Sequence, residues 1–246
     1  MAGFMKRRTY TETVEGRRRF LSRIKYFILF LLCFELLVGV FVTSYSVGSS
    51  SMSPAIVSGD RIVTSPLVFG PLTIFGKVPG IARPARGDIV LVDAPFSTHL
   101  GFFESIADGL LRFVSIQRLT LASRHDPHRL TGPFLERVIA TPGDELYMED
   151  FIFMVRPSGT EHFFTEFELS DRRYDIAKPK QPEGWKPEYP FSGSMKKLLL
   201  AKDEYFVAGD DRASTGDSRY WGPIRSGRLR ANLLFRYWPL GRFGAP

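Results

Sequence analysis

Three polar motifs contain the side chains of this sequence that are best suited to chemistry. They are GSSSMSP at residues 48–54, ERVIATPGD at 136–144 and GDDRASTGDSRYWG at 209–222. A serine hydroxyl is a poor nucleophile unless a neighbouring base takes its proton, so such motifs matter only in combination. Taken singly, each motif is weak, because serine-rich runs are common linkers and Pro-Gly-Asp is a common turn.

Metal and cofactor chemistry have no comparable pattern. The chain has four histidines, and only His125 and His128 lie close together in sequence. Pro127 lies between them and no further ligands cluster nearby, so we expect no metal site there. A glycine-rich phosphate-binding loop is also missing from the sequence. The sequence therefore predicts neither a metal nor a cofactor.

Short β-rich runs surround the three motifs. Valine, isoleucine, phenylalanine and tyrosine are concentrated in stretches bounded by glycine and proline, which is typical of strands. The clearest runs are RIVTSPLVF, GDIVLV, LERVIATP, ELYMEDFIFMV, EYFVAGD and NLLFRYWPL. We therefore predict a mostly β domain over residues 46–246, in which strands and their connections position the polar motifs.

Two segments interrupt the strand pattern. Residues 101–123 place apolar side chains at helical spacing, which predicts one inserted amphipathic helix. Such a helix packs on its own core or lies on a membrane surface, and both interpretations are open. Residues 170–195 are rich in proline and charge and predict an extended, loop-rich surface segment.

The positive charge of the chain is concentrated at its N-terminus. The formal net charge is +7 and the sequence pI is about 9.6. Residues 1–25 hold eight lysines and arginines against two glutamates, so the rest of the chain is nearly neutral. Binding to nucleic acid would need basic residues spread over the folded domain. We therefore expect no nucleic-acid partner.

An apolar segment follows this basic tail. Residues 26–45, with the sequence YFILFLLCFELLVGVFVTSY, are long enough as a helix to cross a hydrocarbon core of about 30 Å. Basic residues flank the segment on its N-terminal side alone, which predicts that residues 1–25 are cytoplasmic and residues 46–246 extracytoplasmic. A cleaved signal peptide is the main alternative. The long basic region favours an uncleaved, single-pass anchor in the cell (inner) membrane.

Two residues within the apolar segment stand out. Glu35 lies near its middle, where a charge costs about 2.5–3.5 kcal/mol on insertion scales. Protonation or access of water would lower that cost, and contact with a partner membrane helix is the alternative. The single cysteine of the chain, Cys33, lies two residues earlier, so no intrachain disulfide is expected.

In order and spacing, the motifs resemble those of the type I signal peptidases, the membrane-bound serine proteases that remove signal peptides from exported proteins. The resemblance also includes LVFG at 67–70, RGD at 86–88 and FRYWP at 235–239. It implies a signal-peptidase-like β fold and a Ser/Lys dyad. Its implied partners are the signal peptides of preproteins, bound in extended form with small residues before the cut, and the lipid bilayer.

The resemblance also implies roles for individual residues. Ser51 falls on the family's nucleophile, and Ser49 falls on a hydroxyl that forms the oxyanion hole together with the Ser51 N–H. One such donor contributes about 2.7–4 kcal/mol to the transition state. Met52 would line the substrate pocket, and Thr215 falls on the hydroxyl that orients the base. Four charged residues fall on positions that brace the active site: Asp210, Arg212, Asp217 and Arg219.

The main departure from the family is Glu136, which occupies the position of the general-base lysine. Burial lowers the pKa of a lysine and makes it a base, whereas burial raises the pKa of a glutamate. Three hypotheses are open: a working Ser51/Glu136 dyad, a base supplied by another lysine, or a weak or inactive homologue. Such a homologue would bind signal peptides or regulate a partner peptidase, with Glu136 in a salt bridge to an arginine. The candidate lysines are Lys77, Lys196, Lys197 and Lys202.

Overall fold

The computed structural model describes residues 10–70, 72–73, 76–77, 80–93, 95, 133–186, 189, 192–213 and 216–246. The predicted helix at 101–123, the two clustered histidines and Thr215 lie outside these residues. The chain divides into two compact units, Met1–Val38 and Gly39–Pro246, and each is described by itself.

Helix α1 spans Tyr10–Phe41. It contains every described residue of the first unit, and its last residues belong to the second unit. It ends four residues before Tyr45, the expected end of the apolar segment, because Thr43–Ser46 forms strand β1. The side chains of a paired strand are often β-branched or aromatic, as Thr43 and Tyr45 are. Within the part of the chain that the structure describes, no helix combines the length and the apolar content needed to cross a membrane.

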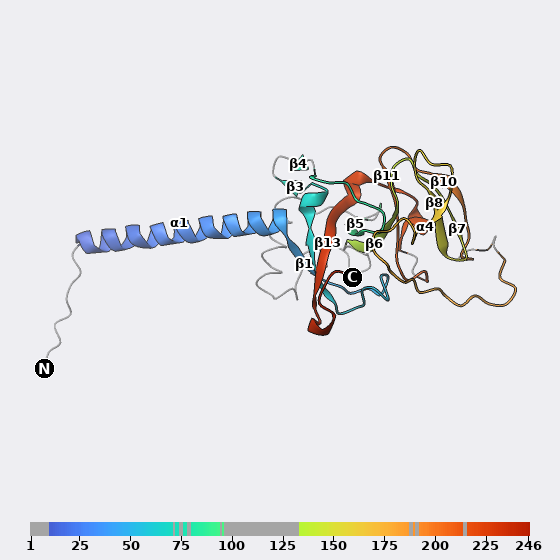
Figure 1. Ribbon diagram of the computed structural model, residues 1–246. Coiled ribbons are helices and arrows are strands. Elements are labelled where there is room, and N and C mark those ends of the chain that lie inside the picture. The colour runs from blue at the N-terminus through green and yellow to red at the C-terminus, as the bar shows by residue number, and fades with distance from the viewer. Residues whose placement is uncertain are drawn as a thin grey trace. The chain divides into compact units, whose positions relative to one another are not determined.

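A seven-stranded antiparallel sheet forms the centre of the second unit, which confirms the mostly β prediction. Its strand order is β1-β2-β13-β5-β6-β11-β12. Strands far apart in sequence therefore lie side by side, and β13 pairs with both β2 and β5 (Figure 1). After β1, its strands are β2 (Arg61–Ser65), β5 (Ile89–Val92), β6 (Phe134–Ala140), β11 (Glu204–Ala208), β12 (Ile224–Arg225) and β13 (Leu229–Trp238).

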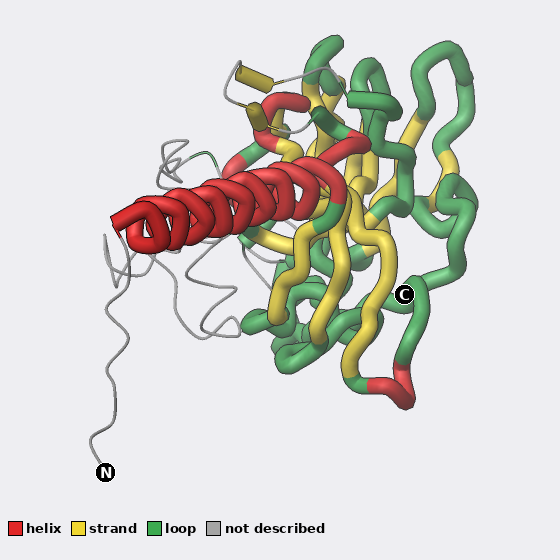
Figure 2. Tube along the Cα trace, turned by 90° about the vertical axis from the view of Figure 1, so that its left-hand side faces the viewer, coloured by secondary structure: helices red, strands yellow, loops and turns green. Residues whose placement is uncertain are grey.

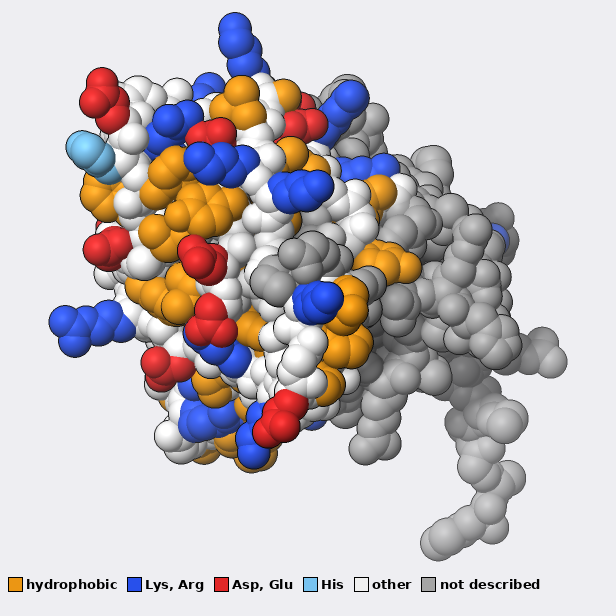
Figure 3. All heavy atoms as spheres, turned by 90° about the vertical axis from the view of Figure 1, so that its right-hand side faces the viewer, with side chains coloured by type: hydrophobic (Ala, Val, Ile, Leu, Met, Phe, Trp, Pro, Cys, Tyr) orange, Lys and Arg blue, Asp and Glu red, His pale blue; other side chains and the backbone are white. Residues whose placement is uncertain are grey.

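A second antiparallel sheet has the order β10-β7-β8-β9. Its strands are β7 (Glu145–Glu149), β8 (Ile152–Arg156), β9 (Phe164–Thr165) and β10 (Met195–Leu199). Buried and partly exposed residues alternate along β7 and β8, as expected when one face of a sheet covers a core. Figure 3 views the molecule from the side on which Figure 1 places β7, β8 and β10, and shows small hydrophobic groups between charged side chains.

The remaining elements are short. A two-stranded sheet pairs β3 (Leu72–Thr73) with β4 (Gly76–Lys77). The short helices are η1 (Pro66–Val68), α4 (Ser218–Trp221), η2 (Ser226–Arg228) and η3 (Leu240–Arg242). Figure 2 shows η3 as the red turn at the lower end of the sheet, beyond the last residue of β13.

Strand β6 links the cores of the two sheets. Leu135 packs with side chains of β2, β5 and the loop after β1, whereas Ile139 packs with Leu146 and Phe153 of the second sheet. All residues of β6 except the first are buried. Because β6 contains both Glu136 and Arg137, the fold places two ionisable side chains inside the protein.

The loop-rich segment at 170–195 differs from the prediction at both ends. Most of residues 171–186 is exposed, as expected of a surface loop. However, the Tyr174 ring lies 3.8 Å from the Arg137 guanidinium carbon, and Ala177 forms a parallel bridge with Asp211. Strand β10 already begins at Met195. The loop therefore also packs against the segment that contains the third motif.

Candidate active site

The candidate nucleophile lies in the connection between β1 and β2, residues 47–60. The connection is closed at its base, because Val47 and Asp60 are joined by a backbone hydrogen bond of 2.8 Å. Within it, Ser53 N–H donates to Ser50 O and Ile56 N–H donates to Met52 O, which folds the chain into a tight turn. Ser51 is 9% exposed at the start of this turn. We call residues 47–60 the nucleophile loop.

Ser49 and Ser51, the two residues expected to form an oxyanion hole, contact each other. The Ser51 N–H donates a hydrogen bond of 3.0 Å to Ser49 Oγ. Both groups are the expected donors to an oxyanion, and here they pair with each other. Their role as an oxyanion hole stays a prediction, because a substrate oxygen would have to replace this hydrogen bond before both groups could donate to it.

Met52 is part of the core. It is 1% exposed and packs with Ile56, Ile62 and Leu135, among others. Its contacts hold the nucleophile loop on the sheet, and its predicted contact with substrate stays a prediction.

Glu136 is fully buried, and neither of its carboxyl oxygens has a hydrogen-bond partner among the described residues. It is paired across the sheet with Val90, which belongs to an apolar cluster. Burial raises the pKa of Glu136 well above its ordinary value, the Asp217 carboxylate raises it further, and Arg219 opposes them. The salt bridge expected of an inactive homologue is not present among the described residues. Glu136 is therefore held in a setting that favours its protonated form.

Gly209 lies close to the main chain of Ser51 and to the carboxyl group of Glu136. A β-carbon at position 209 would lie 2.6 Å from Ser51 O and 3.3 Å from Glu136 Oε2. The Ser51 hydroxyl donates to Leu135 O at 3.4 Å, so its described partner is the residue before Glu136. No hydrogen bond joins the two side chains within the described part of the chain. The structure thus brings the main chain of Ser51 and the carboxyl group of Glu136 close to the same residue, with no described link between the two side chains.

Arg137, the residue after Glu136, and Asp210, the residue after Gly209, form a buried ion pair. Two hydrogen bonds of 2.7 and 2.6 Å join them, and Arg137 also donates to Gly87 O at 2.7 Å. Burial raises the pKa of Asp210, although the hydrogen bonds from Arg137 act in the opposite direction. Asp210 therefore fixes the end of β11 to β6.

Arg212 has a buried partner that the sequence did not reveal. It pairs with Glu166, which also accepts hydrogen bonds from Phe153 N–H at 3.0 Å and from the Tyr174 hydroxyl at 2.7 Å. Burial raises the pKa of Tyr174, and Glu166 raises it further. Glu166 lies in no motif, so only its position in the fold identifies it.

Asp217 and Arg219 close the site on the side of α4. Arg219 donates hydrogen bonds to both carboxylate oxygens of Asp217, and Asp217 in turn accepts one from Gly209 N–H at 3.1 Å. Arg219 also donates to Arg212 O at 2.8 Å. Arg212 and Asp217 therefore hydrogen-bond to Gly209, Asp210 follows it in the chain, and Arg219 reaches it through Asp217.

The candidate lysines do not reach Ser51 in the described residues. Lys196 and Lys197 lie on β10 in the second sheet, and the Lys197 ammonium lies 5.0 Å from the centre of the Phe163 ring. Lys202 is exposed. No described lysine donates a hydrogen bond to the Ser51 hydroxyl. The side chain of Lys77, on β4, lies outside the described residues.

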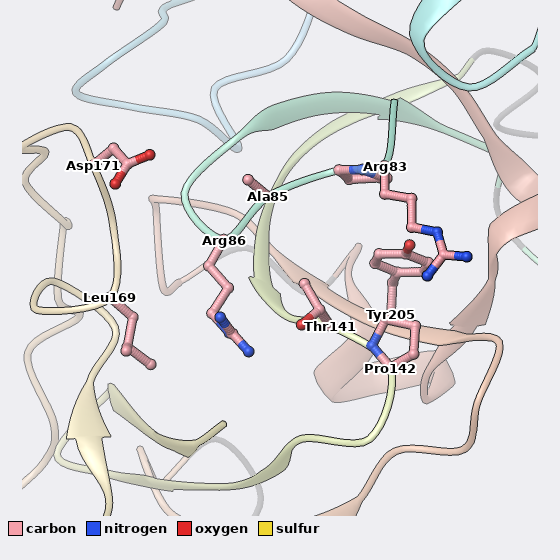
Figure 4. A pocket seen from close by; sticks show the side chains of 9 residues that line it. Arg83, Ala85, Arg86, Thr141, Pro142, Leu169, Asp171 and Tyr205 are labelled. Carbon is pink, nitrogen blue, oxygen red and sulfur yellow. The ribbon is translucent and has the colours of Figure 1, made fainter. Parts of the chain in front are cut away.

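A separate cavity of about 410 Å³ lies near the far end of β6. Figure 4 shows Arg83 beside Tyr205, with Arg86 extending between Leu169 and Thr141. Arg86 donates two hydrogen bonds to Asp144, which lower the pKa of that carboxyl despite its burial. The residues that line it are Arg83, Pro84, Ala85, Arg86, Thr141, Pro142, Leu169, Asp171 and Tyr205. Since neither Ser51 nor Glu136 lines it, this cavity is distinct from the candidate site.

Comparison with known proteins assigns the family. Residues 20–238 match the family described as signal peptidase, peptidase S26. The chain belongs to this family. This confirms the resemblance inferred from the motifs, while the glutamate at position 136 is a feature that the match does not address.

Individual relatives agree with the family match. The chain is 25% identical over 196 residues to a probable signal peptidase I-2 of Synechocystis sp., a match that covers 80% of this chain and 63% of that protein. It is 25% identical over 194 residues to thylakoidal processing peptidase 1 of Arabidopsis thaliana, covering 79% and 41%. Signal peptidase IB of Staphylococcus aureus is 22% identical over 209 residues, covering 84% of each chain.

Proposed function

We propose that this chain is a membrane-anchored serine endopeptidase that removes N-terminal signal peptides from exported preproteins. The observation that carries the proposal is that the main chain of Ser51 and the carboxyl group of Glu136 lie close to the same residue, Gly209. A carboxyl group without a hydrogen-bond partner in the described residues is available to accept the serine proton. Family membership supports peptide hydrolysis as the reaction.

The proposed mechanism has two halves. The Ser51 hydroxyl turns from Leu135 O toward Glu136, its proton passes to the Glu136 carboxylate, and Ser51 Oγ bonds to the scissile carbonyl carbon. Ser51 N–H and Ser49 Oγ–H donate to the oxyanion. Glu136 then protonates the leaving amine, the C–N bond breaks, and an acyl-enzyme remains on Ser51. In the second half, water attacks the ester, Glu136 accepts its proton, and Ser51 recovers that proton.

Burial has two opposing effects on Glu136 as a base. A raised pKa makes the carboxylate a stronger base, but it also reduces the ionised fraction at neutral pH. The bracing residues act in both directions, because the carboxylates of Asp217 and Asp210 raise the pKa of Glu136 further, whereas the positive charges of Arg219 and Arg212 favour its ionised form. A Ser51/Glu136 dyad would therefore gain activity as the pH rises and Glu136 loses its proton.

The proposed substrate is a signal peptide with small residues, such as Ala-x-Ala, before the cut. It would bind in extended form and pair its backbone with a strand edge near Ser51. Met52 and Thr215 keep their proposed roles at the pocket and beside the base.

Anchoring is proposed from the sequence of residues 26–45 and the basic tail. A single span with residues 1–25 in the cytoplasm would place the domain at the outer surface of the cell (inner) membrane. For Glu35, protonation or access of water is the proposed way of lowering the cost of a carboxyl in lipid, and contact with a partner membrane helix is the alternative.

A second candidate function is a homologue that binds signal peptides without cleaving them, or regulates a partner peptidase. The observation that favours it is the missing hydrogen bond between Ser51 and Glu136 among the described residues. A protonated Glu136 would then be a neutral side chain of the binding site.

A cleavage assay on an Ala-x-Ala preprotein separates the two candidates. The full chain in detergent is compared with Ser51→Ala, Glu136→Gln, Glu136→Lys and the control Ser50→Ala. Active wild type should lose at least about a thousandfold in kcat in Ser51→Ala and change less than about twofold in Ser50→Ala. Loss of activity in Glu136→Gln, with activity kept when each candidate lysine (Lys77, Lys196, Lys197 and Lys202) is replaced by alanine, supports the dyad. No cleavage by wild type, with gain in Glu136→Lys, supports the binding homologue.

A further inference from the structure

We propose that Asp60, Arg236 and Arg242 form a positioning cluster that holds the nucleophile loop in its reactive geometry. The inference rests on the proposed function, since it concerns the orientation of Ser51. None of the three residues touches the Ser51 side chain in a described contact, so they act through the backbone of the loop.

Asp60 is the centre of this cluster. It is 1% exposed, although it is an acid at the base of a surface loop. One carboxylate oxygen accepts from Val57 N–H at 3.0 Å and from Arg236 Nη1 at 3.2 Å, and the other pairs with Arg242. A buried carboxylate with three donors is held in one position. Asp60 therefore ties the loop to two arginines from the C-terminal segment.

Arg236 reaches further into the loop. Its Nη1 donates to Ala55 O at 2.8 Å, and its Nε donates to Arg242 O at 2.6 Å. Arg236 lies near the end of β13, where it pairs across the sheet with Ile62, close to the base of the loop. One guanidinium group thus contacts the turn after Ser51, the base of the loop and the segment that follows β13.

Arg242 depends on a fold of the chain after β13. The backbone groups of Arg236 and Gly244 exchange two hydrogen bonds, 2.8 and 3.1 Å long, around η3. This turns the chain back, as Figure 2 shows for the red turn beyond β13, so that Arg242 reaches Asp60. The C-terminal segment is therefore built to place a second cation on the same carboxylate.

Away from this cluster, Asp211 N–H donates a hydrogen bond of 2.9 Å to Ser51 O. The Asp60 cluster and this bond together hold Ser51 from two sides. Loss of the cluster would leave the fold intact and let the turn at 51–56 move. Catalysis is sensitive to such movement, because a shift of about 1 Å can cost about a hundredfold in rate.

The chain offers a matched control. Arg230, on the same strand β13, pairs with Asp93 at 2.6 Å. Its side chain is 42% exposed and that of Asp93 is 6% exposed, against 38% for Arg242 and 1% for Asp60. Both pairs join a partly exposed arginine to a buried aspartate, but Asp93 follows β5 and lies outside the nucleophile loop.

The test compares Arg242→Gln, Arg242→Lys and Arg230→Gln in the full chain in detergent, with an Ala-x-Ala preprotein as substrate. We expect Arg242→Gln to lower kcat by about tenfold to a hundredfold with KM changed less than about twofold. Arg242→Lys should recover most of that loss, because it keeps a cation on Asp60. In hydrogen exchange, Arg242→Gln should lose protection at residues 49–57 and nowhere else.

Equal kcat values in Arg242→Gln and Arg230→Gln, with unchanged exchange at residues 49–57, would overturn the positioning role while wild type still cleaves. If wild type does not cleave the preprotein, the proposed protease function is overturned, and the positioning role with it. A fall in kcat that follows global loss of exchange protection would show a folding role alone, and would also contradict the proposal.

Discussion

The nucleophile loop and the base position differ in how completely the protein satisfies their polar groups. Ser51 is held through its N–H, its carbonyl and its hydroxyl, and the loop around it is tied to a buried acid with two arginines. Glu136 is equally well placed on the sheet, yet both of its oxygens are buried without a described partner. The Ser51 side of the candidate site is therefore held in place by hydrogen bonds, whereas the Glu136 carboxyl on the other side has no described hydrogen-bond partner.

This difference follows from the chemistry of a buried carboxyl group. A neutral amine tolerates a dry setting, whereas a carboxylate loses its hydration there. The arginines that face Glu136 are already engaged, Arg212 by Glu166 and Arg219 by Asp217. The chain therefore keeps the serine side of the site in order and leaves the acid dependent on pH.

The largest expected effect on kcat concerns the serine side of the site, where a proposed oxyanion donor is removed. Ser49→Ala removes the hydroxyl that pairs with Ser51 N–H, so kcat should fall by about 10²–10³-fold with little change in KM. Steady-state cleavage of an Ala-x-Ala preprotein measures this, with Ser50→Ala as the control. If the two variants behave alike, Ser49 does not contribute to the oxyanion hole.

Gly209 joins the two halves, so enlarging it should disturb both. In Gly209→Ala the new β-carbon would lie 2.6 Å from Ser51 O, and the loop must move. We expect kcat to fall by about tenfold to a hundredfold and the free energy of unfolding to fall by about 1–3 kcal/mol.

Gly227→Ala is the matched control for Gly209→Ala, because a β-carbon there meets nothing within 4 Å. Chemical denaturation and steady-state kinetics are measured on both variants. A Gly209→Ala protein that matches this control in both would contradict the close approach of Ser51 and Glu136 at Gly209.

For Glu136, whose carboxyl oxygens have no described hydrogen-bond partner, we expect a smaller effect, on the free energy of unfolding. Because burial raises the pKa of Glu136, the folded chain keeps its proton to a higher pH than the unfolded chain does. The free energy of unfolding should therefore fall as the pH rises above the ordinary value of 4.5. Glu136→Gln removes this titration and should be more stable than wild type at high pH by about 1–3 kcal/mol.

Denaturation curves across the pH range measure that difference, with the exposed Glu149→Gln as the control. A stability difference between wild type and Glu136→Gln that is the same at acidic pH and at high pH would contradict a buried, titrating Glu136.

Much of the fold followed from local sequence patterns. Short runs rich in valine, isoleucine and phenylalanine became strands, because such residues suit a half-buried pleated surface. The end of α1 was missed, since residues 43–45 continue the apolar segment but pair with β2. Burial of Tyr174 was also missed, because its partners, Arg137 and Glu166, come from other strands and turns.

The residues of the candidate site also fall into those that the sequence predicted and those that only the structure revealed. Motif spacing led to Ser49, Ser51 and Asp210, because the family's chemistry fixes those residue types. Glu166 and Asp60 lie outside any chemical motif, and only strand pairing brings each to its arginines. The sequence could not show that Glu136 lacks a described salt bridge, because arginines lie near it in sequence. Only the packing around Glu136 reveals this.

The pH dependence of cleavage by wild type and Glu136→Gln tests the account most directly. If Ser51 and Glu136 form a dyad, kcat for an Ala-x-Ala preprotein should rise with pH as Glu136 loses its proton, with a midpoint above 4.5, the ordinary pKa of a glutamate. Glu136→Gln should be inactive throughout. Cleavage by Glu136→Gln at the wild-type rate, or a wild type silent at every pH, would contradict the dyad.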